Sequence, residues 1–111
     1  IRISSGNSFV HETESQVILN GSYDVGFTMD LVCKDLKLFD KLTRDYNIST
    51  QISPLILNIF EEGKKLYGKR ALSTSIVKLL EDKCQEYLRA PGFPSKLVDK
   101  EIKKKGIEIK F

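Results

Sequence analysis

The stretch GFTMDLVCKDLKLF, residues 26–39, decides the fold because it carries the longest amphipathic pattern in the chain. Wound as a helix at about 100° per residue, residues 27–46 place their apolar side chains in one continuous arc. That arc covers roughly 200°, about twice the width that an ordinary surface helix needs. We therefore expect one long helix over about residues 26–46 that packs on two sides.

Two charged residues interrupt this pattern. Asp35 falls near the centre of the arc, between Leu42 and Tyr46, and Lys34 falls at the edge of the arc beside Phe27. A carboxylate among apolar side chains is costly unless a cation or several hydrogen-bond donors satisfy it. For Asp35 we favour a structural partner, such as a buried ion pair or a cap for another helix, over contact with a ligand.

Lys34 has two interpretations that the pattern alone does not separate. In one, it pairs with Asp30 at i, i+4 spacing while its aliphatic stem lies along Phe27. In the other, it is a site residue, because a lysine at the rim of an apolar surface can meet an anionic or amide-bearing ligand from another domain.

Three further helices are indicated. The first spans about residues 8–20, between the capping residues of SSGN and the NG stop. The second starts at SPLILNIF, with Ser53 as N-cap and Pro54 at the first helical position, and ends at Gly68. The third spans about residues 75–88, and its predicted buried stripe is Ile76, Val77, Leu80, Cys84, Tyr87 and Leu88. APGFP then ends helical structure.

The expected product is an all-α bundle of about four helices. For residues 91–111, which contain Pro and Gly and many charges, we expect a tail that is extended along the surface or partly disordered. A chain of 111 residues with 41% hydrophobic content is the size of one small domain with a modest core. No apolar run is long enough to span a membrane, and the missing initiator Met and signal segment suggest a processed or excised piece.

Charge and cysteine usage exclude several function classes. The net charge of +3 is mild, and acidic residues are interspersed, which argues against nucleic-acid binding. Cys33 and Cys84 lack the spacing of metal ligands, so we expect reduced, partly buried thiols in a cytoplasmic protein and no metal site. His11 has no nucleophile or carboxylate pattern around it, which favours a solvent-facing or packing role.

Four segments follow one another over about residues 2–90. They are SSGNSF, then GFTMDLVCKDLKLF, then a helix that starts at a proline, and last a helix with the sequence IVKLLED. This order resembles the C-terminal helical domain of the β-hydroxyacid dehydrogenases, a family that includes 3-hydroxyisobutyrate, tartronate semialdehyde and threonate dehydrogenases. The resemblance implies that residues 1–90 adopt a fold like the C-terminal domain of 6-phosphogluconate dehydrogenase. The family's long first helix is missing here, which should leave the other helices poorly covered.

The resemblance also implies a function. The family's enzymes transfer a hydride reversibly between NAD or NADP, held by an N-terminal Rossmann domain, and a short 3-hydroxy acid. This chain has neither the GxGxxG fingerprint nor the family's catalytic lysine segment, so we expect no catalytic residue in it and no activity of the chain alone. A homodimer or higher oligomer is expected, and the alternative function is a non-catalytic helical dimerisation module.

Individual site residues follow from the family's motif. Lys34 matches the lysine that contacts the cofactor near the nicotinamide, and Phe27 matches the aromatic that lines the same pocket. Ser5 and Gly6 match the loop at the substrate pocket, although for Ser5 a helix-capping role is favoured. Asp35 matches a neighbouring acid with a structural supporting role. The particular hydroxy acid and the choice between NAD and NADP are set largely by the missing part.

Overall fold

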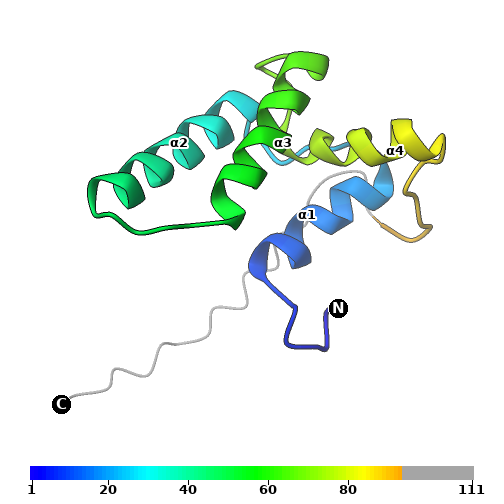
Figure 1. Cartoon of the computed structure of the whole chain (residues 1–111). Coiled ribbons are helices and arrows are strands. Elements are labelled where there is room, and N and C mark those ends of the chain that lie inside the picture. Colours follow the sequence, from blue (N-terminus) through cyan, green and yellow to red (C-terminus); the bar gives the residue numbers. More distant parts are fainter. Residues whose placement is uncertain (94–111) are drawn as a thin grey trace.

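The computed structural model describes residues 1–93, and these residues form helices without a named strand (Figure 1). An isolated bridge joins Thr28 to Leu72. The predicted all-α class is therefore confirmed, while most of the predicted tail, residues 94–111, lies outside the described residues. None of the described helices is both long and apolar enough to cross a bilayer. The elements are α1 (Phe9–Asn20), α2 (Met29–Asp45), α3 (Ile52–Tyr67), the 3-10 turn η1 (Ser73–Val77) and α4 (Lys78–Cys84).

Helix α1 lies almost within its predicted bounds and ends at Gly21 as predicted, but its N-cap is Ser8 and not a residue of SSGN. The Ser8 side chain accepts a hydrogen bond from the His11 backbone N–H at 3.0 Å. At the other end, Gly21 adopts the left-handed conformation, φ +82°, and its N–H donates to the carbonyl of Ile18. The capping role predicted for Ser5 is wrong, because Ser8 fills it and Ser5 lies exposed in the turn before the helix.

Helix α2 begins three residues later than predicted. The carbonyl of Phe27 accepts from the N–H of Ser73 at 2.7 Å, and the N–H of Met29 donates to the carbonyl of Ala71 at 2.8 Å. These bonds hold residues 27 and 28 against the segment that leads into η1. Phe27 therefore precedes the helix, and its predicted place on the helical arc is wrong.

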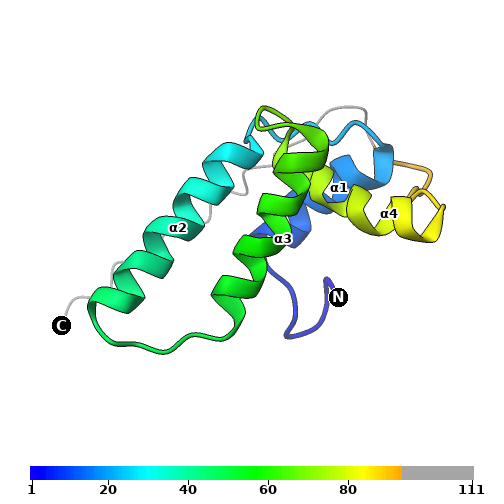
Figure 2. The ribbon, with the colours of Figure 1, turned by 45° about the horizontal axis from the view of Figure 1, so that its top comes forward.

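Helices α2 and α3 form an antiparallel hairpin, and they lie side by side in both ribbon views (Figures 1 and 2). Met29 and Cys33 are fully buried on α2. On α3, Gly63 leaves room for two neighbours: an added Cβ would lie 2.6 Å from Cδ1 of Ile76 and 3.2 Å from the sulfur of Met29. The hairpin therefore packs closely only because residue 63 has no side chain.

Two predicted features of the later helices are wrong. Helix α3 starts at Ile52, after Gln51, so Ser53 is not its N-cap, although Gly68 ends it as predicted. The helix predicted over residues 75–88 is a 3-10 turn followed by only seven α-helical residues, because Gln85 turns left-handed with φ +55°. Within its predicted buried stripe, Leu80, Cys84, Tyr87 and Leu88 are exposed. Both cysteines are free, as predicted, but only Cys33 is buried.

The face of α4 that packs inward carries Glu81, a carboxylate with only 5% of its surface exposed. Glu81 accepts hydrogen bonds from the Tyr23 hydroxyl at 2.6 Å, the Arg89 guanidinium at 2.8 Å and the Leu88 N–H at 2.9 Å. This cluster joins the end of α1, α4 and the segment after α4. A polar network, and not the predicted apolar stripe, therefore anchors α4.

The apolar core of residues 1–93 is small. Its buried apolar side chains are Val17, Tyr23, Met29 and Cys33. Most of the large apolar side chains of α2 and α3 are instead exposed by more than a third. This agrees with the expectation that the helices of this chain are poorly covered.

We predict that Gly63→Ala lowers the free energy of unfolding by about 1–3 kcal/mol, because the added methyl overpacks the contact with Ile76 and Met29. Urea denaturation followed by circular dichroism measures the change. The matched control is Gly6→Ala, whose Cβ would meet nothing closer than 3.6 Å and should shift the free energy by less than about 0.5 kcal/mol. Equal stability of the two variants would contradict this account of the hairpin.

A second prediction concerns pH. Burial opposes ionisation of Glu81, but the hydrogen bonds from Tyr23, Leu88 and Arg89 outweigh it and lower the pKa of Glu81. Because the folded pKa is depressed, this carboxylate stabilises the fold above the unfolded pKa, about 4.3, and the contribution disappears as pH falls through the folded value. Glu81→Gln should therefore be less stable than wild type by about 1–3 kcal/mol at pH 7, with a smaller difference at pH 3. Urea titrations at both pH values measure it, and a constant difference would exclude this role.

Candidate functional site

The charged pair on α2 lies on the uncovered side of the helix. The Lys34 ammonium is 3.1 Å from a carboxylate oxygen of Asp35, and the two side chains are 59% and 57% exposed. The prediction that Asp35 points into a packed arc is therefore wrong, because α3 covers only the opposite half of that arc. The predicted pair of Lys34 with Asp30 is also wrong, since Asp30 accepts a hydrogen bond from Thr28 and pairs with Arg70 at 3.8 Å.

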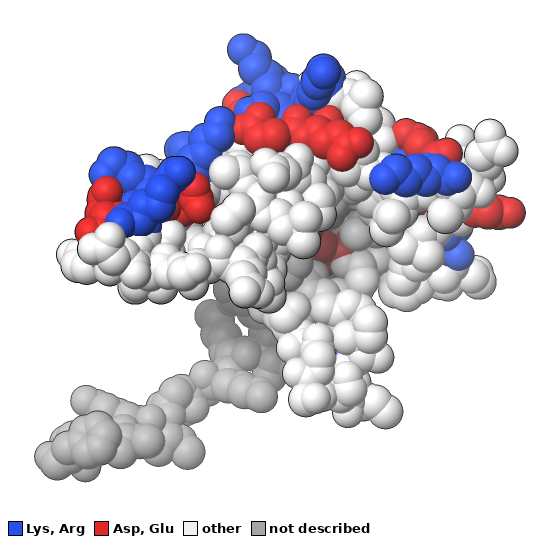
Figure 3. All heavy atoms as spheres, viewed as in Figure 1, with Lys and Arg blue, Asp and Glu red and all other residues white. Residues whose placement is uncertain are grey.

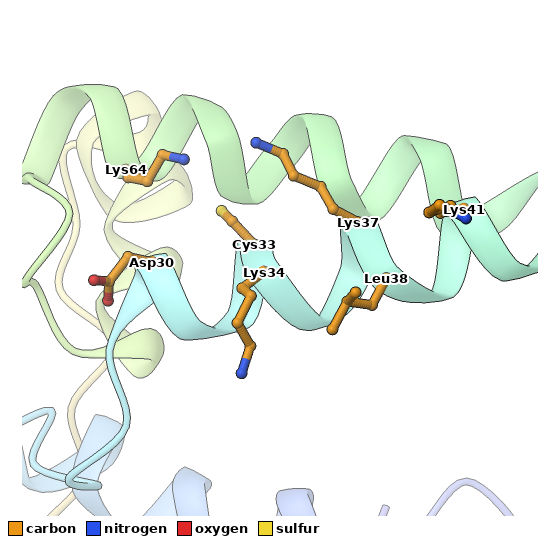
Figure 4. A pocket seen from close by; sticks show the side chains of 7 residues that line it. All are labelled: Asp30, Cys33, Lys34, Lys37, Leu38, Lys41 and Lys64. Atoms are coloured by element: carbon orange, nitrogen blue, oxygen red, sulfur yellow. The ribbon is translucent and has the colours of Figure 1, made fainter.

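Lys34 lies on a shallow groove of about 390 Å³ between α2 and α3. The lining residues are Asp30, Cys33, Lys34, Lys37, Leu38, Lys41 and Lys64. In Figure 4 the amines of Lys37 and Lys64 lie near α3, whereas Lys34 points away from α3, to the side of α2 where Leu38 also points. Lys34 therefore stands apart from the other lysines of the groove.

The other lysines are held by carboxylates. Lys37 and Lys64 each lie 2.6 Å from a carboxylate oxygen of Glu61, and Lys41 lies 2.5 Å from one of Asp45. The hydrogen bonds from Lys37 and Lys64 lower the pKa of Glu61 to about 2. Glu61 in turn raises the pKa of Lys64. These ion pairs neutralise much of the positive charge of the groove.

Two lysines of the groove, Lys34 and Lys41, are held by exposed ion pairs. The bond of Lys34 to Asp35 joins neighbours in the sequence, and both side chains of this pair, like those of Lys41 and Asp45, are more than half exposed. Exposed ion pairs of this kind contribute only about 0–1 kcal/mol, so a ligand that offers an anion or an amide oxygen can replace Asp35 at small cost. The arrangement can bind and orient a ligand. It offers no paired acid and base for proton transfer among the groove residues.

The remaining predicted site residues do not line this groove. Phe27 lies in the segment before α2, partly exposed, with its backbone held by Ser73. Ser5 and Gly6 are exposed in the N-terminal turn, where the Gly6 N–H donates to the Ser4 hydroxyl at 3.3 Å. The structure thus brings Lys34 and Asp35 together, and the binding roles of Phe27, Ser5 and Gly6 stay predictions.

Sequence reasoning missed the ion pairs of the groove. Lys37 and Lys41 follow Lys34 at helical spacing, a signal that places the three lysines along one side of α2. The spacing cannot reveal Lys64 and Glu61, which reach the groove from the other helix.

The Cys33 thiol, which lines the groove, and the His11 imidazole on α1 add no metal site. Burial raises the pKa of Cys33, so its thiol stays protonated near neutral pH. His11 is half-buried on α1. Within residues 1–93, no three His, Cys, Asp or Glu side chains gather closely enough to hold a metal ion.

Comparison with known proteins gives one family and one relative. The family described as "NAD-binding of NADP-dependent 3-hydroxyisobutyrate dehydrogenase" matches residues 1–80. The 2-(hydroxymethyl)glutarate dehydrogenase of Eubacterium barkeri is 30% identical over 79 residues, which are 70% of this chain and 26% of that enzyme. The chain thus spans about a quarter of the length of this relative. No solved structure matches the chain significantly.

Proposed function

The chain belongs to the family of the NAD-binding domain of NADP-dependent 3-hydroxyisobutyrate dehydrogenase, and from this premise we propose that it is the C-terminal helical part of an NAD(P)-dependent 3-hydroxyacid dehydrogenase. The reaction is reversible hydride transfer between a nicotinamide cofactor and a short 3-hydroxy acid. Support comes from the family match over residues 1–80 and from the dehydrogenase name of the relative. The nicotinamide of the cofactor would accept the hydride from the hydroxy acid, or donate it in the reverse direction, and this chain's residues would bind and orient the cofactor.

The observation that carries the proposal is the position of Lys34. Its amine lies at the edge of a groove that Leu38 also lines, and within residues 1–93 its ion-pair partner is the exposed Asp35. A cation next to an apolar surface fits one edge of a nicotinamide site, while the cofactor-binding role of Phe27, which does not line this groove, stays a prediction from the resemblance. The hydrogen-bond donors of this groove are enough for one edge of a nicotinamide site but not for a complete dinucleotide site. In this proposal the Rossmann domain and the catalytic lysine of the enzyme lie on another part of the polypeptide.

A second candidate is a non-catalytic helical module that acts through protein contacts, including self-association. The observation that favours it is the large exposed apolar surface, which on α1 includes Phe9 and Val10.

We expect a homodimer or higher oligomer in sedimentation velocity of the purified chain. A monomer at all concentrations would remove the self-association part of both candidates.

We predict that Lys34→Ala, made in the dehydrogenase that contains this chain, raises the KM for the cofactor about tenfold. The reason is the loss of one hydrogen bond from a charged donor, which contributes about 1.5–3 kcal/mol. Initial rates at varied cofactor and saturating hydroxy acid give KM and kcat separately.

The matched control is Lys65→Ala, because Lys65 is an exposed lysine on α3 that does not line the groove. This variant should keep the wild-type KM. Equal values of KM and kcat in Lys34→Ala and wild type would rule out the assignment of Lys34. A tenfold effect of Lys65→Ala would instead indicate a general effect of surface charge.

A further inference from the structure

Helix α1 is held to the rest of the described chain by few buried side chains. Val17 is its fully buried residue, while Phe9 and Val10 are exposed by more than half. Within residues 1–93, no ion pair joins a side chain of α1 to another element. In Figure 3 charged side chains gather along the upper edge of the molecule, whereas the lower part, where α1 lies, shows almost none. A helix of 12 residues is marginal on its own in water, so α1 depends on the contacts that hold it.

The segment that follows α4 returns to the C-terminal end of α1 (Figure 1). The Ala90 N–H donates to the carbonyl of Leu19 at 3.1 Å, and the Arg89 guanidinium donates to the carbonyl of Ile18 at 3.3 Å. Both carbonyls belong to the last turn of α1, where the regular helical hydrogen bonds end. A positive charge at this end of a helix also interacts favourably with the helix dipole. Residues 88–90 therefore cap α1 from outside the helix.

Arg89 connects this cap to α4. Its guanidinium donates to Glu81 at 2.8 Å and to the Tyr23 hydroxyl at 2.5 Å, and it lies 5.1 Å from the centroid of the Tyr23 ring. Glu81 and Tyr23 are buried, whereas the Arg89 side chain is 34% exposed. One side chain at the surface therefore joins the end of α1 to two buried groups.

The position of Arg89 depends on Gly21. A Cβ at residue 21 would lie 2.6 Å from Nε and 3.2 Å from Cζ of Arg89. A side chain there would displace the guanidinium from its bonds. The glycine that ends α1 thus also leaves the space in which Arg89 lies.

The α2–α3 hairpin does not share these bonds. Within the described chain, the hydrogen bonds of residues 88–90 go to α1, Tyr23, Glu81 and each other, and none of them reaches α2 or α3. The Tyr23 carbonyl accepts from the Thr74 hydroxyl at 2.5 Å, which ties the chain after α1 to η1. Parts of a fold with few buried contacts open at a lower free energy than the core. Movement of α1 therefore needs no rearrangement of the hairpin.

We propose that residues 88–90 form a latch that holds α1 closed. When Arg89 leaves its partners, α1 opens as a unit while the α2–α3 hairpin stays folded. Opening exposes the Val17 side chain and the surface of η1 against which α1 packs. This conformational device goes beyond the proposed dehydrogenase function and does not depend on a cofactor.

The first test is amide hydrogen exchange of the wild-type full chain, followed residue by residue by NMR over a series of low urea concentrations. The amides of residues 13–20 should exchange by an opening that depends less on urea than the opening that exposes the Cys33 amide, because a local opening exposes less surface. Identical urea dependence at residues 13–20 and at Cys33 would show that α1 opens only with the whole fold, and would overturn the proposal.

The second test is Arg89→Ala in the same chain. Exchange at residues 13–20 should become about tenfold faster, because the end of α1 loses a hydrogen bond from a charged donor. Exchange in α2 and α3 should stay within about twofold of the wild-type rates. An equal increase in all helices, or no increase in α1, would contradict the latch.

The matched control is Arg70→Ala. Arg70 also pairs with a carboxylate, that of Asp30 at 3.8 Å, but this pair joins it to α2. The variant should leave the exchange of residues 13–20 at the wild-type rates. An increase there as large as in Arg89→Ala would show that loss of any surface arginine loosens α1, and would exclude the latch. Neither measurement uses a cofactor, so its outcome is separate from that of the Lys34 assay.

Discussion

The structure depends on how much of the apolar arc of α2 one neighbouring helix can cover. The arc spans roughly twice the width that a single contact buries, and α3 is the helix that packs along it. Met29 and Cys33 are buried on the covered half, while Leu38 and Leu42 remain exposed on the other. The remaining elements follow from this contact, because η1 and the segment before α2 meet at the end of the hairpin where Gly63 allows a close approach.

The proposed cofactor contact rests on an exposed ion pair. Lys34 and Asp35 are adjacent, bound to each other, and largely solvated. A ligand that draws Lys34 away leaves the Asp35 carboxylate to water, at the cost of an exposed pair, about 0–1 kcal/mol. Glu61 holds Lys37 and Lys64, whereas Lys41 pairs with Asp45 in a contact that is as exposed as that of Lys34.

Predictions from the sequence are most accurate where a local signal acts alone, although Ser53 and Pro54 misplaced the start of α3. Ser8 and Gly21 set the ends of α1 through hydrogen bonds within one turn, and Gly68 ends α3 in the same way. They fail where a distant segment competes. Phe27 is drawn out of α2 by the N–H of Ser73, and Gln85 ends α4 early, where the chain turns back toward α1 and Arg89 reaches Glu81. Prediction of the groove is limited in the same way. The sequence pattern of α2 identifies Lys34, but it contains no information on Glu61 and Lys64, which lie on α3.

By itself, the sequence determined the helical class, the order of the helices, the apolar arc of α2 and the special position of its charged pair. Each of these follows from helical periodicity or from turn chemistry within a few residues. The tertiary structure alone decided which half of the arc is covered, and it placed Asp35 on the uncovered half beside Lys34. A periodic pattern in the sequence predicts that one face of a helix is apolar. Whether another helix covers that face depends on how the helices pack, which the pattern does not contain.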